Sequence, residues 1–426
     1  MSYLMKTMKL SRLKTLTTLA LCVISGAAPL IADETSLAAD RKQIEQLDQL
    51  TAVPKMQAAE GFDSTPQLRA IYFDALDWKG KPTKVFAWLG LPAKTEGKVP
   101  GIVLVHGGGG TAFKNWVQMW NDKGYAAISI AVEGQIDRRP KGERKEGAYW
   151  QRHKWPGPTR QGIYGDSNVP LKEQWMYHAV ADTILANSLL RSLPEVDGSK
   201  VGLMGISWGG VITSTVIGID QRFAFAIPTY GCGNLATVEN QYGRALGNNP
   251  TYKQVWDPML RLNRATMPTL WFSWPGDKHF PMDKFAMNYG AVKGPYMVSL
   301  IPKMGHGHGP PWKKPDSYAF ADSIVRDGKA WCRQTSVKRD GRTFSATFES
   351  SKPLQTATLI STTDTGITGN REWIESSASL EKKDGKWIAQ AELPKGSTAW
   401  FINVHSDKLT VSSDYQEANL TTSPSK

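Results

Sequence analysis

The sequence predicts an α/β fold, in which helices cover a mainly parallel β-sheet, followed by an all-β C-terminal module. From Val99 to about Arg333, short apolar runs typical of buried strands alternate with helical runs, which is the pattern of a parallel sheet covered on both faces. From about Gln334 onward, helical periodicity disappears and short alternating runs replace it. The chain has 426 residues, 41% hydrophobic and 21% charged, which is an ordinary globular composition and enough length for more than one domain.

The N-terminus predicts an export signal over residues 1–32. Four basic residues precede an apolar run at 16–24 that is too short to span a bilayer, and small residues suited to cleavage after Ala28 or Ala32 follow it. Removing this segment takes away four basic residues and no acidic one, so the net charge falls from +12 to +8. We expect a periplasmic or secreted protein with no membrane anchor after cleavage. Cys232 and Cys332 remain in the mature chain, and the sequence does not decide whether they form a disulfide in that oxidising compartment.

The remaining elements divide the mature chain into two domains, an α/β domain at 33–333 and a β-sandwich module at 334–420. We expect an N-terminal helix within 33–60, then a hairpin of strands at 67–73 and 84–89. The α/β part continues with strands at 99–105, 126–131 and 223–230, and with a long helix at 173–193. The module has strand-like runs at 343–348, 356–360, 387–393 and 399–404. Asp384-Gly385 is a hairpin turn signal just before the third of these.

The pentapeptide Gly205-Ile206-Ser207-Trp208-Gly209 places a serine between a strand-like run and a helix-like run. Such a tight turn needs small residues on both sides of the serine, because a side chain there would clash with the bend. The turn exposes the hydroxyl and directs the N-terminus of the helix at it. The pattern predicts that Ser207 is a catalytic nucleophile. A tight turn around a buried serine is the alternative.

Two later loops supply an acid and a base in the order that such a nucleophile requires. Asp277 follows the strand-like run 268–274, and the segment His306-Gly307-His308 follows the run 296–302. We favour His306 as the base because it comes first after the strand, with His308 as the alternative. Asp283 is the alternative acid, although its sequence context predicts a helix cap. A metal site on the His-Gly-His loop is a poor alternative, since carboxylate ligands are missing nearby.

Four glycines and a preceding histidine, His106, follow the strand at 99–105. Glycines let backbone N–H groups approach a developing oxyanion, and we expect the N–H groups of Gly108 and Trp208 to form the oxyanion hole. A phosphate-binding loop does not fit, because no Lys-Ser/Thr pair follows the glycines. We expect His106 to be structural, because it precedes the turn and falls outside the order of the triad.

An insertion at about 135–172 leaves the sheet at the edge that bears these groups. Between residues 136 and 160 it holds eight basic residues against three acidic ones, with aromatic residues interleaved. Loops at this edge shape substrate pockets, so we expect a lid that includes Arg138, Arg139, Trp150 and Trp155. The alternative is a solvated basic loop held in place by its aromatic residues. Binding of nucleic acid does not suit an exported hydrolase.

Through the motifs described above, the chain resembles the α/β-hydrolase superfamily, and within it the bacterial acetyl xylan esterase-like and dienelactone hydrolase-like branch. The resemblance covers roughly residues 65–330, and the segments that carry it are 106–110, 205–210, Tyr230-Gly231-Cys232-Gly233, Asp277 and 306–308. Dienelactone hydrolases use a cysteine nucleophile where this chain has Ser207. The C-terminal module resembles the sandwich appended to some exported hydrolases.

The resemblance implies an exported serine esterase that acts through an acyl-enzyme and requires no metal or organic cofactor. We expect its substrate to be a small ester or an acylated polysaccharide or oligosaccharide. One alternative is a serine peptidase of the prolyl oligopeptidase-like type, although the short stretch before the core leaves no room for a propeller. The other is a non-catalytic carbohydrate-binding protein, against which an intact triad argues.

Overall fold

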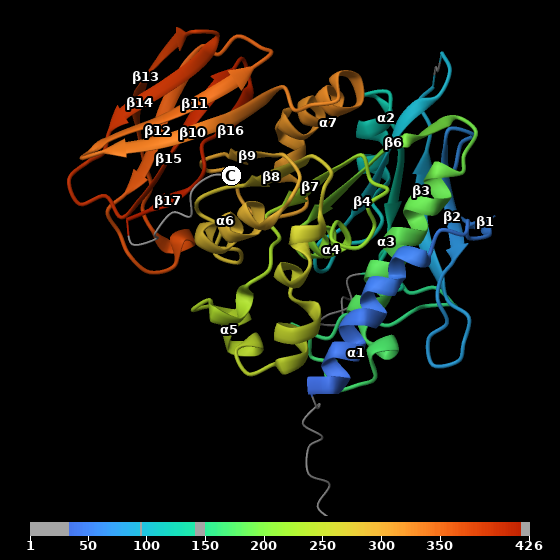
Figure 1. Cartoon of the computed structure of the whole chain (residues 1–426). Coiled ribbons are helices and arrows are strands. Elements are labelled where there is room, and N and C mark those ends of the chain that lie inside the picture. The colour runs from blue at the N-terminus through green and yellow to red at the C-terminus, as the bar shows by residue number, and fades with distance from the viewer. Residues whose placement is uncertain (1–33, 94–95, 141–149, 419–426) are drawn as a thin grey trace, which may run out of the picture.

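The structure is a computed structural model that describes residues 34–93, 96–140 and 150–418. The expected export signal therefore lies outside the described residues. A twisted β-sheet runs through the molecule, helices cover both of its faces, and a second group of strands follows it at the C-terminal end (Figure 1). The strands of the α/β part are β1 Met56–Ala58, β2 Leu68–Asp74, β3 Lys84–Gly90, β4 Val99–Val105, β5 Ala126–Ile130, β6 Val196–Ile206, β7 Phe225–Thr229, β8 Thr269–Ser273 and β9 Tyr296–Leu300.

These strands are hydrogen-bonded in the order β1-β2-β3-β5-β4-β6-β7-β8-β9. The pairs β1–β2, β2–β3 and β3–β5 are antiparallel, so the predicted opening hairpin is present, and all pairs from β5 to β9 are parallel. The mainly parallel sheet predicted from the sequence is confirmed. Because β4, β6, β8 and β9 run in one direction, the loops that follow them meet at one edge of the sheet.

Helices divide between the two faces, and each face has its own hydrophobic core (Figure 1). One core is built largely from α3 and α4 with α1 and α6, and the other from α2 and α7. Helix α3 is buried over almost its whole length, so polar residues such as Asp182 and Asn187 are buried in it together with the apolar ones. The helices are α1 Glu34–Glu45, α2 Lys114–Asn121, α3 Trp175–Arg191, α4 Trp208–Val216, α5 Gln241–Leu246, α6 Met282–Ala291 and α7 Asp316–Asp327.

The C-terminal module is a stack of two antiparallel sheets. One has the order β10-β11-β14-β13, and the other the order β13-β12-β15-β16, with β13 shared. The strands are β10 Cys332–Asp340, β11 Thr343–Ser350, β12 Thr356–Thr362, β13 Ile374–Lys383, β14 Lys386–Glu392, β15 Ala399–Ser406, β16 Leu409–Ser412 and β17 Gln416–Glu417. The four predicted runs are β11, β12, β14 and β15. Strand β13 escaped prediction because most of its residues are exposed, so no apolar alternation marks it.

The module is joined to the α/β part by strand pairing. Ser412 of β16 pairs antiparallel with Val298 of β9, so one sheet of the module continues the central sheet. The first strand, β10, also begins at Cys332, before the expected boundary at 334. An edge strand leaves backbone N–H and C=O groups unpaired, and β16 covers this edge. The turn Asp384-Gly385 has φ values of 50° and 79°, as expected for the predicted hairpin.

The two cysteines do not form a disulfide. Cys232 and Cys332 are both free and buried, and they belong to different hydrophobic cores. No helix in the described ranges is long and apolar enough to cross a membrane.

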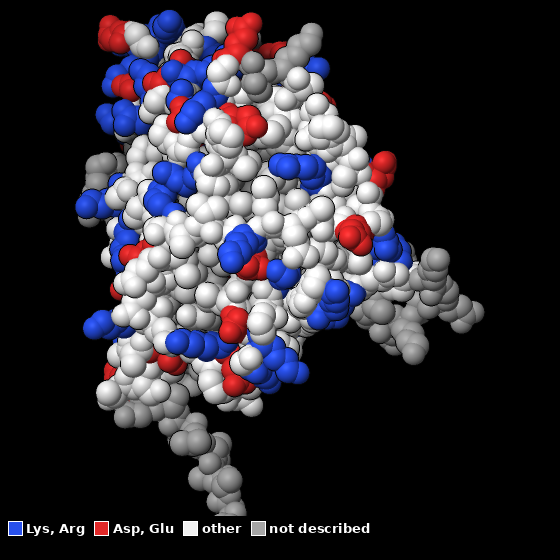
Figure 2. Space-filling view, turned by 90° about the vertical axis from the view of Figure 1, so that its right-hand side faces the viewer, with Lys and Arg blue, Asp and Glu red and all other residues white. Residues whose placement is uncertain are grey.

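The charge of the chain is spread out on the face next to β1, β2 and β3. Figure 2 shows lysine and arginine side chains set among acidic and uncharged ones over much of that face. The positive net charge of +12 is therefore not gathered there into one continuous basic patch.

Candidate active site

Ser207 lies at the sharp turn between a strand and a helix. Strand β6 ends at Ile206, and helix α4 begins at Trp208. The backbone of Ser207 has φ 58° and ψ −116°, a sparsely populated conformation for a residue with a side chain. The Ser207 N–H donates a hydrogen bond of 3.0 Å to the carbonyl oxygen of Thr229 at the end of β7, which helps to hold this turn.

The glycines on either side of the turn are required by close backbone contacts. A Cβ atom added at Gly205 would lie 2.0 Å from the carbonyl oxygen of Gly209. A Cβ atom at Gly209 would lie 2.1 Å from the carbonyl oxygen of Val105. The structure thus supplies the steric reason for the small residues that the sequence pattern demanded.

Three side chains from three loops form one hydrogen-bonded chain. His306 Nε2 lies 2.9 Å from Ser207 Oγ, and His306 Nδ1 lies 2.8 Å from Asp277 Oδ2. Asp277 is fully buried, and its Oδ1 accepts hydrogen bonds from the N–H groups of His279 (2.8 Å) and Phe280 (3.0 Å). With Nδ1–H donating to the carboxylate, Nε2 is left to accept the serine proton.

Asp283, the alternative acid, lies elsewhere. It is in the first turn of α6 and forms an ion pair of 3.2 Å with Lys284. Pro281 is the N-cap residue of that helix, so the expectation that Asp283 caps it is wrong. Acidic residues in a first helical turn also interact favourably with the helix dipole without capping it.

Tyr230 supports the His306 loop, a role that sequence reasoning missed. Its ring centroid lies 4.5 Å from that of His306, and its hydroxyl donates a hydrogen bond to the carbonyl oxygen of Gly307. Its φ of 29° is unusual for a tyrosine. Tyr230 directly follows β7 at the same edge of the sheet as Ser207, and that position is the signal that would have found it.

His308 bonds to the glycine loop and not to the serine hydroxyl. Its Nε2 accepts a hydrogen bond of 3.0 Å from the Gly107 N–H, and its ring packs against Phe113 and Trp116 at 5.2 and 6.0 Å. Burial lowers the pKa of His308, which favours the neutral ring that this hydrogen bond needs. The two histidines of the loop therefore have separate tasks.

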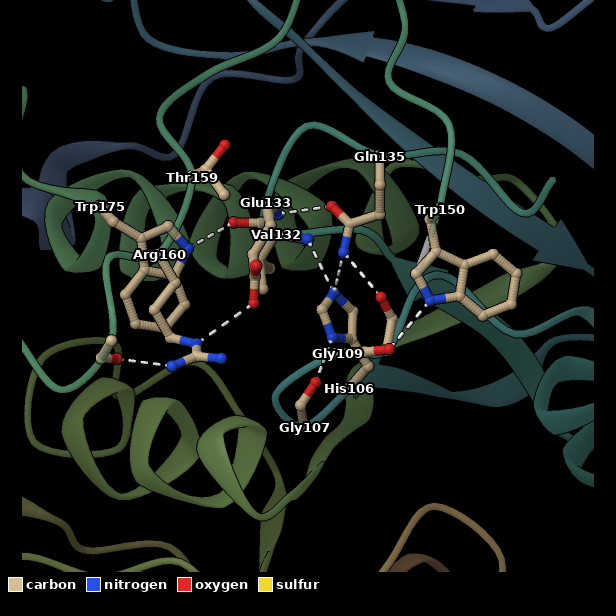
Figure 3. Close-up of polar contacts among 12 residues, drawn as sticks. His106, Gly107, Gly109, Val132, Glu133, Gln135, Trp150, Thr159, Arg160 and Trp175 are labelled. Atoms are coloured by element: carbon tan, nitrogen blue, oxygen red, sulfur yellow. Dashed lines mark hydrogen bonds and ion pairs between the residues drawn. The ribbon is translucent and has the colours of Figure 1, made fainter. Parts of the chain in front are cut away.

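His106 also holds the glycine loop through hydrogen bonds of its ring (Figure 3). Its Nδ1–H donates to the Gly107 carbonyl at 2.7 Å, and its Nε2 accepts from the Val132 N–H at 3.1 Å and from Gln135 Nε2 at 3.0 Å. Gln135 Nε2 also donates to the Gly110 carbonyl at 2.9 Å. Burial lowers the pKa of His106 to about 3, so the ring is neutral near pH 7.

Gly108 and Trp208, the expected oxyanion-hole residues, lie side by side. A Cβ atom added at Gly108 would be 3.0 Å from Cδ1 of the Trp208 ring. Within the described residues, neither backbone N–H has a hydrogen-bond partner. The structure therefore brings two available donors together beside Ser207.

The predicted lid residues separate into two groups. Trp150 donates from its indole N–H to the Gly109 carbonyl at 2.9 Å, and the Arg139 guanidinium lies 3.7 Å from the Trp150 ring centroid. This pair lies at the glycine loop. Residues 141–149, which precede Trp150, lie outside the described residues.

The other two predicted lid residues contact the N-terminal part of the domain instead. Arg138 donates to the Gly61 carbonyl and lies over the Phe62 ring at 4.7 Å. Trp155 packs against Tyr72 of β2, with ring centroids 5.5 Å apart. The order of these residues in the sequence could not reveal the division.

Arg160 is another charged residue that the insertion places at the glycine loop, and sequence reasoning did not single it out. A Cβ atom added at Gly108 would be 3.0 Å from Arg160 Nη2. The guanidinium lies 5.1 Å from the Trp208 ring centroid and forms an ion pair of 3.3 Å with Glu133. In the sequence, Arg160 is one of eight basic residues, and nothing local distinguishes it.

The described residues include no group of three or more His, Cys, Asp or Glu side chains arranged to hold a metal ion. His306 and His308 do not converge on one point, because the first bonds to Ser207 and Asp277 and the second to Gly107. The loop is therefore arranged for proton transfer and backbone support.

Two family models match parts of the chain. The acetyl xylan esterase family model matches residues 41–234, and the prolyl oligopeptidase family model matches residues 162–322. The chain has the α/β-hydrolase fold and is acetyl xylan esterase-like in sequence over residues 41–234. Both matches indicate a serine hydrolase, and the first of them indicates a carboxylic ester hydrolase.

Several solved structures are similar to this chain at low sequence identity. An acetyl xylan esterase from Paenibacillus sp. R4 is 19% identical with a TM-score of 0.50, over 70% of this chain and 95% of that one. Acetyl xylan esterase 1 from Thermoanaerobacterium sp. JW/SL YS485 is 17% identical with a TM-score of 0.48, over 64% and 89%. A putative dienelactone hydrolase from Klebsiella pneumoniae is 17% identical with a TM-score of 0.39, over 57% and 90%. No curated protein matches the chain.

Proposed function

We propose that this esterase is exported and removes acyl groups from polysaccharide or oligosaccharide substrates, with Ser207, His306 and Asp277 as its catalytic triad. The observation that carries the proposal is the continuous hydrogen-bonded chain from Ser207 Oγ through His306 to the buried Asp277. The carbohydrate substrate is inferred from the similarity to acetyl xylan esterases. Export is inferred from the basic and apolar N-terminal sequence.

The first half of the reaction acylates the serine. Ser207 Oγ forms a bond to the ester carbonyl carbon, its proton moves to His306 Nε2, and the carbonyl electron pair moves onto the oxygen. Asp277 holds the imidazole in the required tautomer and stabilises its cation. When the tetrahedral intermediate collapses, the bond to the alcohol oxygen breaks and His306 returns its proton to that oxygen.

The oxyanion formed in this step is placed next to Gly108 and Trp208. Their backbone N–H groups are the donors that we assign to it, and neither has a hydrogen-bond partner among the described residues. Donors fixed in advance stabilise the developing charge without reorganising during the reaction. His106 and His308 contribute by holding the glycine loop through Gly107.

The second half of the reaction releases the acid. Water, with His306 accepting its proton, attacks the acyl carbon, and Ser207 Oγ leaves with the proton that His306 returns. The products are the free alcohol, here a sugar hydroxyl, and a carboxylic acid. All proton transfers in this scheme are carried by His306.

Ser207→Ala tests this proposal against a panel of p-nitrophenyl acyl esters, acetylated xylan and peptide amides. We expect the variant to fold normally and to lose ~10⁴-fold or more of kcat on esters, as triad knockouts do. A folded variant with a rate close to wild type would refute the assignment.

The same panel tests a second candidate function. The match to the prolyl oligopeptidase family model favours a serine peptidase. Faster turnover of peptide amides than of esters by the wild-type enzyme would support it. Activity on p-nitrophenyl acetate without activity on acetylated xylan would keep the esterase and overturn the carbohydrate substrate.

A further inference from the structure

Arg160 is anchored at two of its three guanidinium nitrogens. Its Nε lies 3.3 Å from Glu133 Oε1, and its Nη1 donates to the Gly162 carbonyl at 2.5 Å. The guanidinium also lies 5.1 Å from the ring centroid of Trp208 and 5.9 Å from that of Trp175, as cation–π contacts do. Figure 3 shows Arg160 beside Trp175 and Glu133. A long side chain is thus held in one position.

The third nitrogen, Nη2, lies beside Gly108, one of the two residues assigned to the oxyanion hole. It lies 3.0 Å from the position of a Cβ atom on Gly108, and that position is also 3.0 Å from Cδ1 of Trp208. Within the described residues, Nη2 has no hydrogen-bond partner, although it carries two N–H donors. A glycine at position 108 is what leaves room for the guanidinium there.

The surroundings of Arg160 leave its charge weakly screened by water. The side chains of Arg160 and Glu133 are only 19% and 15% exposed, so little water screens them. Their position is also coupled to the glycine loop. The Glu133 N–H donates to Gln135 Oε1 at 2.8 Å, and Gln135 in turn holds Gly110 and His106 (Figure 3). One network therefore fixes both the backbone donors and the arginine.

We propose that Arg160 is a third donor of the oxyanion hole, with Nη2–H binding the carbonyl oxygen of the substrate as it becomes negative. The proposal rests on the esterase function and triad proposed above. A hydrogen bond from a guanidinium to an anionic oxygen is shorter and stronger than one between neutral groups. Because the charge on the oxygen is fully developed only in the transition state, this contact raises kcat more than it lowers KM.

The main experiment measures kcat and KM for a small neutral ester, p-nitrophenyl acetate, on Arg160 variants. Arg160→Met removes the charge and the donors at similar size, and Arg160→Lys keeps the charge without the fork. Removing one oxyanion donor typically costs about 10²–10³-fold in kcat. We expect a loss of that order for Arg160→Met with KM changed less than about threefold, and a smaller loss for Arg160→Lys.

A matched control separates this effect from the loss of any ion pair. Arg264 forms an ion pair with Glu45, at 2.9 Å and with side chains 41% and 44% exposed, and contacts the N-terminal helix instead of the active site. Arg264→Met should leave kcat on p-nitrophenyl acetate unchanged. Thermal unfolding of each variant shows whether the fold is kept, and Arg160→Lys remains informative if Arg160→Met does not fold.

Rescue by a small cation gives a readout that a structural role would not move. Guanidinium ion added to Arg160→Ala should restore part of kcat, because it can occupy the vacated position, and it should not restore His306→Ala. Partial rescue confined to the arginine variant supports the proposal. No rescue of kcat in a folded Arg160→Ala protein overturns it.

The outcomes distinguish failure of this inference from failure of the proposed function. If wild type hydrolyses p-nitrophenyl acetate, Ser207→Ala does not, and the Arg160 variants match wild type within about twofold, Arg160 is not an oxyanion donor although the triad stands. If the Arg160 variants lose activity only on esters that bear a carboxylate, Arg160 selects charged substrates and the proposal is wrong. If Ser207→Ala keeps wild-type activity, the triad and the proposal fall together.

Discussion

The two sides of Ser207 are built in different ways. On the acid–base side, comprising His306 and Asp277, side chains from the loops after β9 and β8 are joined directly by hydrogen bonds of 2.9 and 2.8 Å. On the oxyanion side, the loop 107–110 presents backbone N–H groups, and side chains such as His308 act on that backbone from behind. Chemistry on the first side depends on side-chain identity, and on the second side it depends on where the backbone is held.

The two sides also receive support from different parts of the chain. The insertion after β5 holds the oxyanion side through Gln135 and Trp150. The C-terminal module reaches the acid–base side, because a short helical turn, Thr368–Asn370, packs against the Asp277 loop. A Cβ atom added at Gly369 would lie 2.2 Å from the Asp277 carbonyl oxygen. The module is therefore also a support for the catalytic acid.

Two histidines separated by one residue give the strongest test of this comparison. We expect His306→Ala to lose ~10⁴-fold or more of kcat on p-nitrophenyl acetate, since it removes a group that carries the proton. His308→Ala should lose roughly ten- to a hundredfold, because it only loosens the Gly107 backbone and leaves the oxyanion donors themselves in place. The reverse order would exchange the roles of the two residues, and equal partial losses would make both of them supports.

A substitution in the C-terminal module tests whether that module supports the acid. Gly369→Ala forces the Asp277 loop to move, because of the 2.2 Å contact. A displacement of about 1 Å at a catalytic group can cost ~10²-fold, so we expect kcat to fall by about 10- to 100-fold with little change in KM. Gly290→Ala is the control, since a Cβ atom there would meet nothing within 4 Å. Equal activity of both variants would show that the module does not position Asp277.

The neutral state of His106 is tested by the pH dependence of unfolding. Its pKa falls from 6.5 to about 3 through burial, so the unfolded chain binds one more proton between these values. The contribution of the neutral ring to the free energy of unfolding is complete above pH 6.5. It is lost as the pH falls from 6.5 to about 3, by about 1.4 kcal/mol per pH unit. We expect His106→Asn to show a shallower loss of stability on acidification, measured by denaturant unfolding from pH 7 to 4. A parallel pH profile would contradict the neutral ring.

The smallest effect is expected for the basic insertion. If Arg138 and Arg139 attract anionic acylated saccharides, the ratio of kcat/KM for acidic over neutral substrates should fall as salt rises, since screening acts within ~8 Å at physiological ionic strength. The double variant Arg138→Ala with Arg139→Ala should lower the ratio by a few-fold, mostly through KM, and spare small neutral esters. A ratio that is flat with salt and unchanged in the double variant would make this segment a solvated surface.

Local patterns in the sequence were enough for the parts of the site that depend on neighbouring residues. The turn at Ser207 could be predicted because its steric demand falls on Gly205 and Gly209, which are close in the chain. The parallel sheet could be predicted from the alternation of runs, and parallel strands then bring Asp277 and His306 to the same edge. These inferences needed no knowledge of packing between distant segments.

Tertiary structure alone decided everything that depends on contacts between distant segments. It gave His306 and His308 different partners, 99 and 201 residues away in the chain, and it placed Arg160 rather than Arg138 at the glycine loop. It also kept the two cysteines in separate cores and brought Gly369 onto the Asp277 loop. Basic residues with similar local sequences look alike until packing decides which one is desolvated beside the glycine loop, and the whole fold makes that selection.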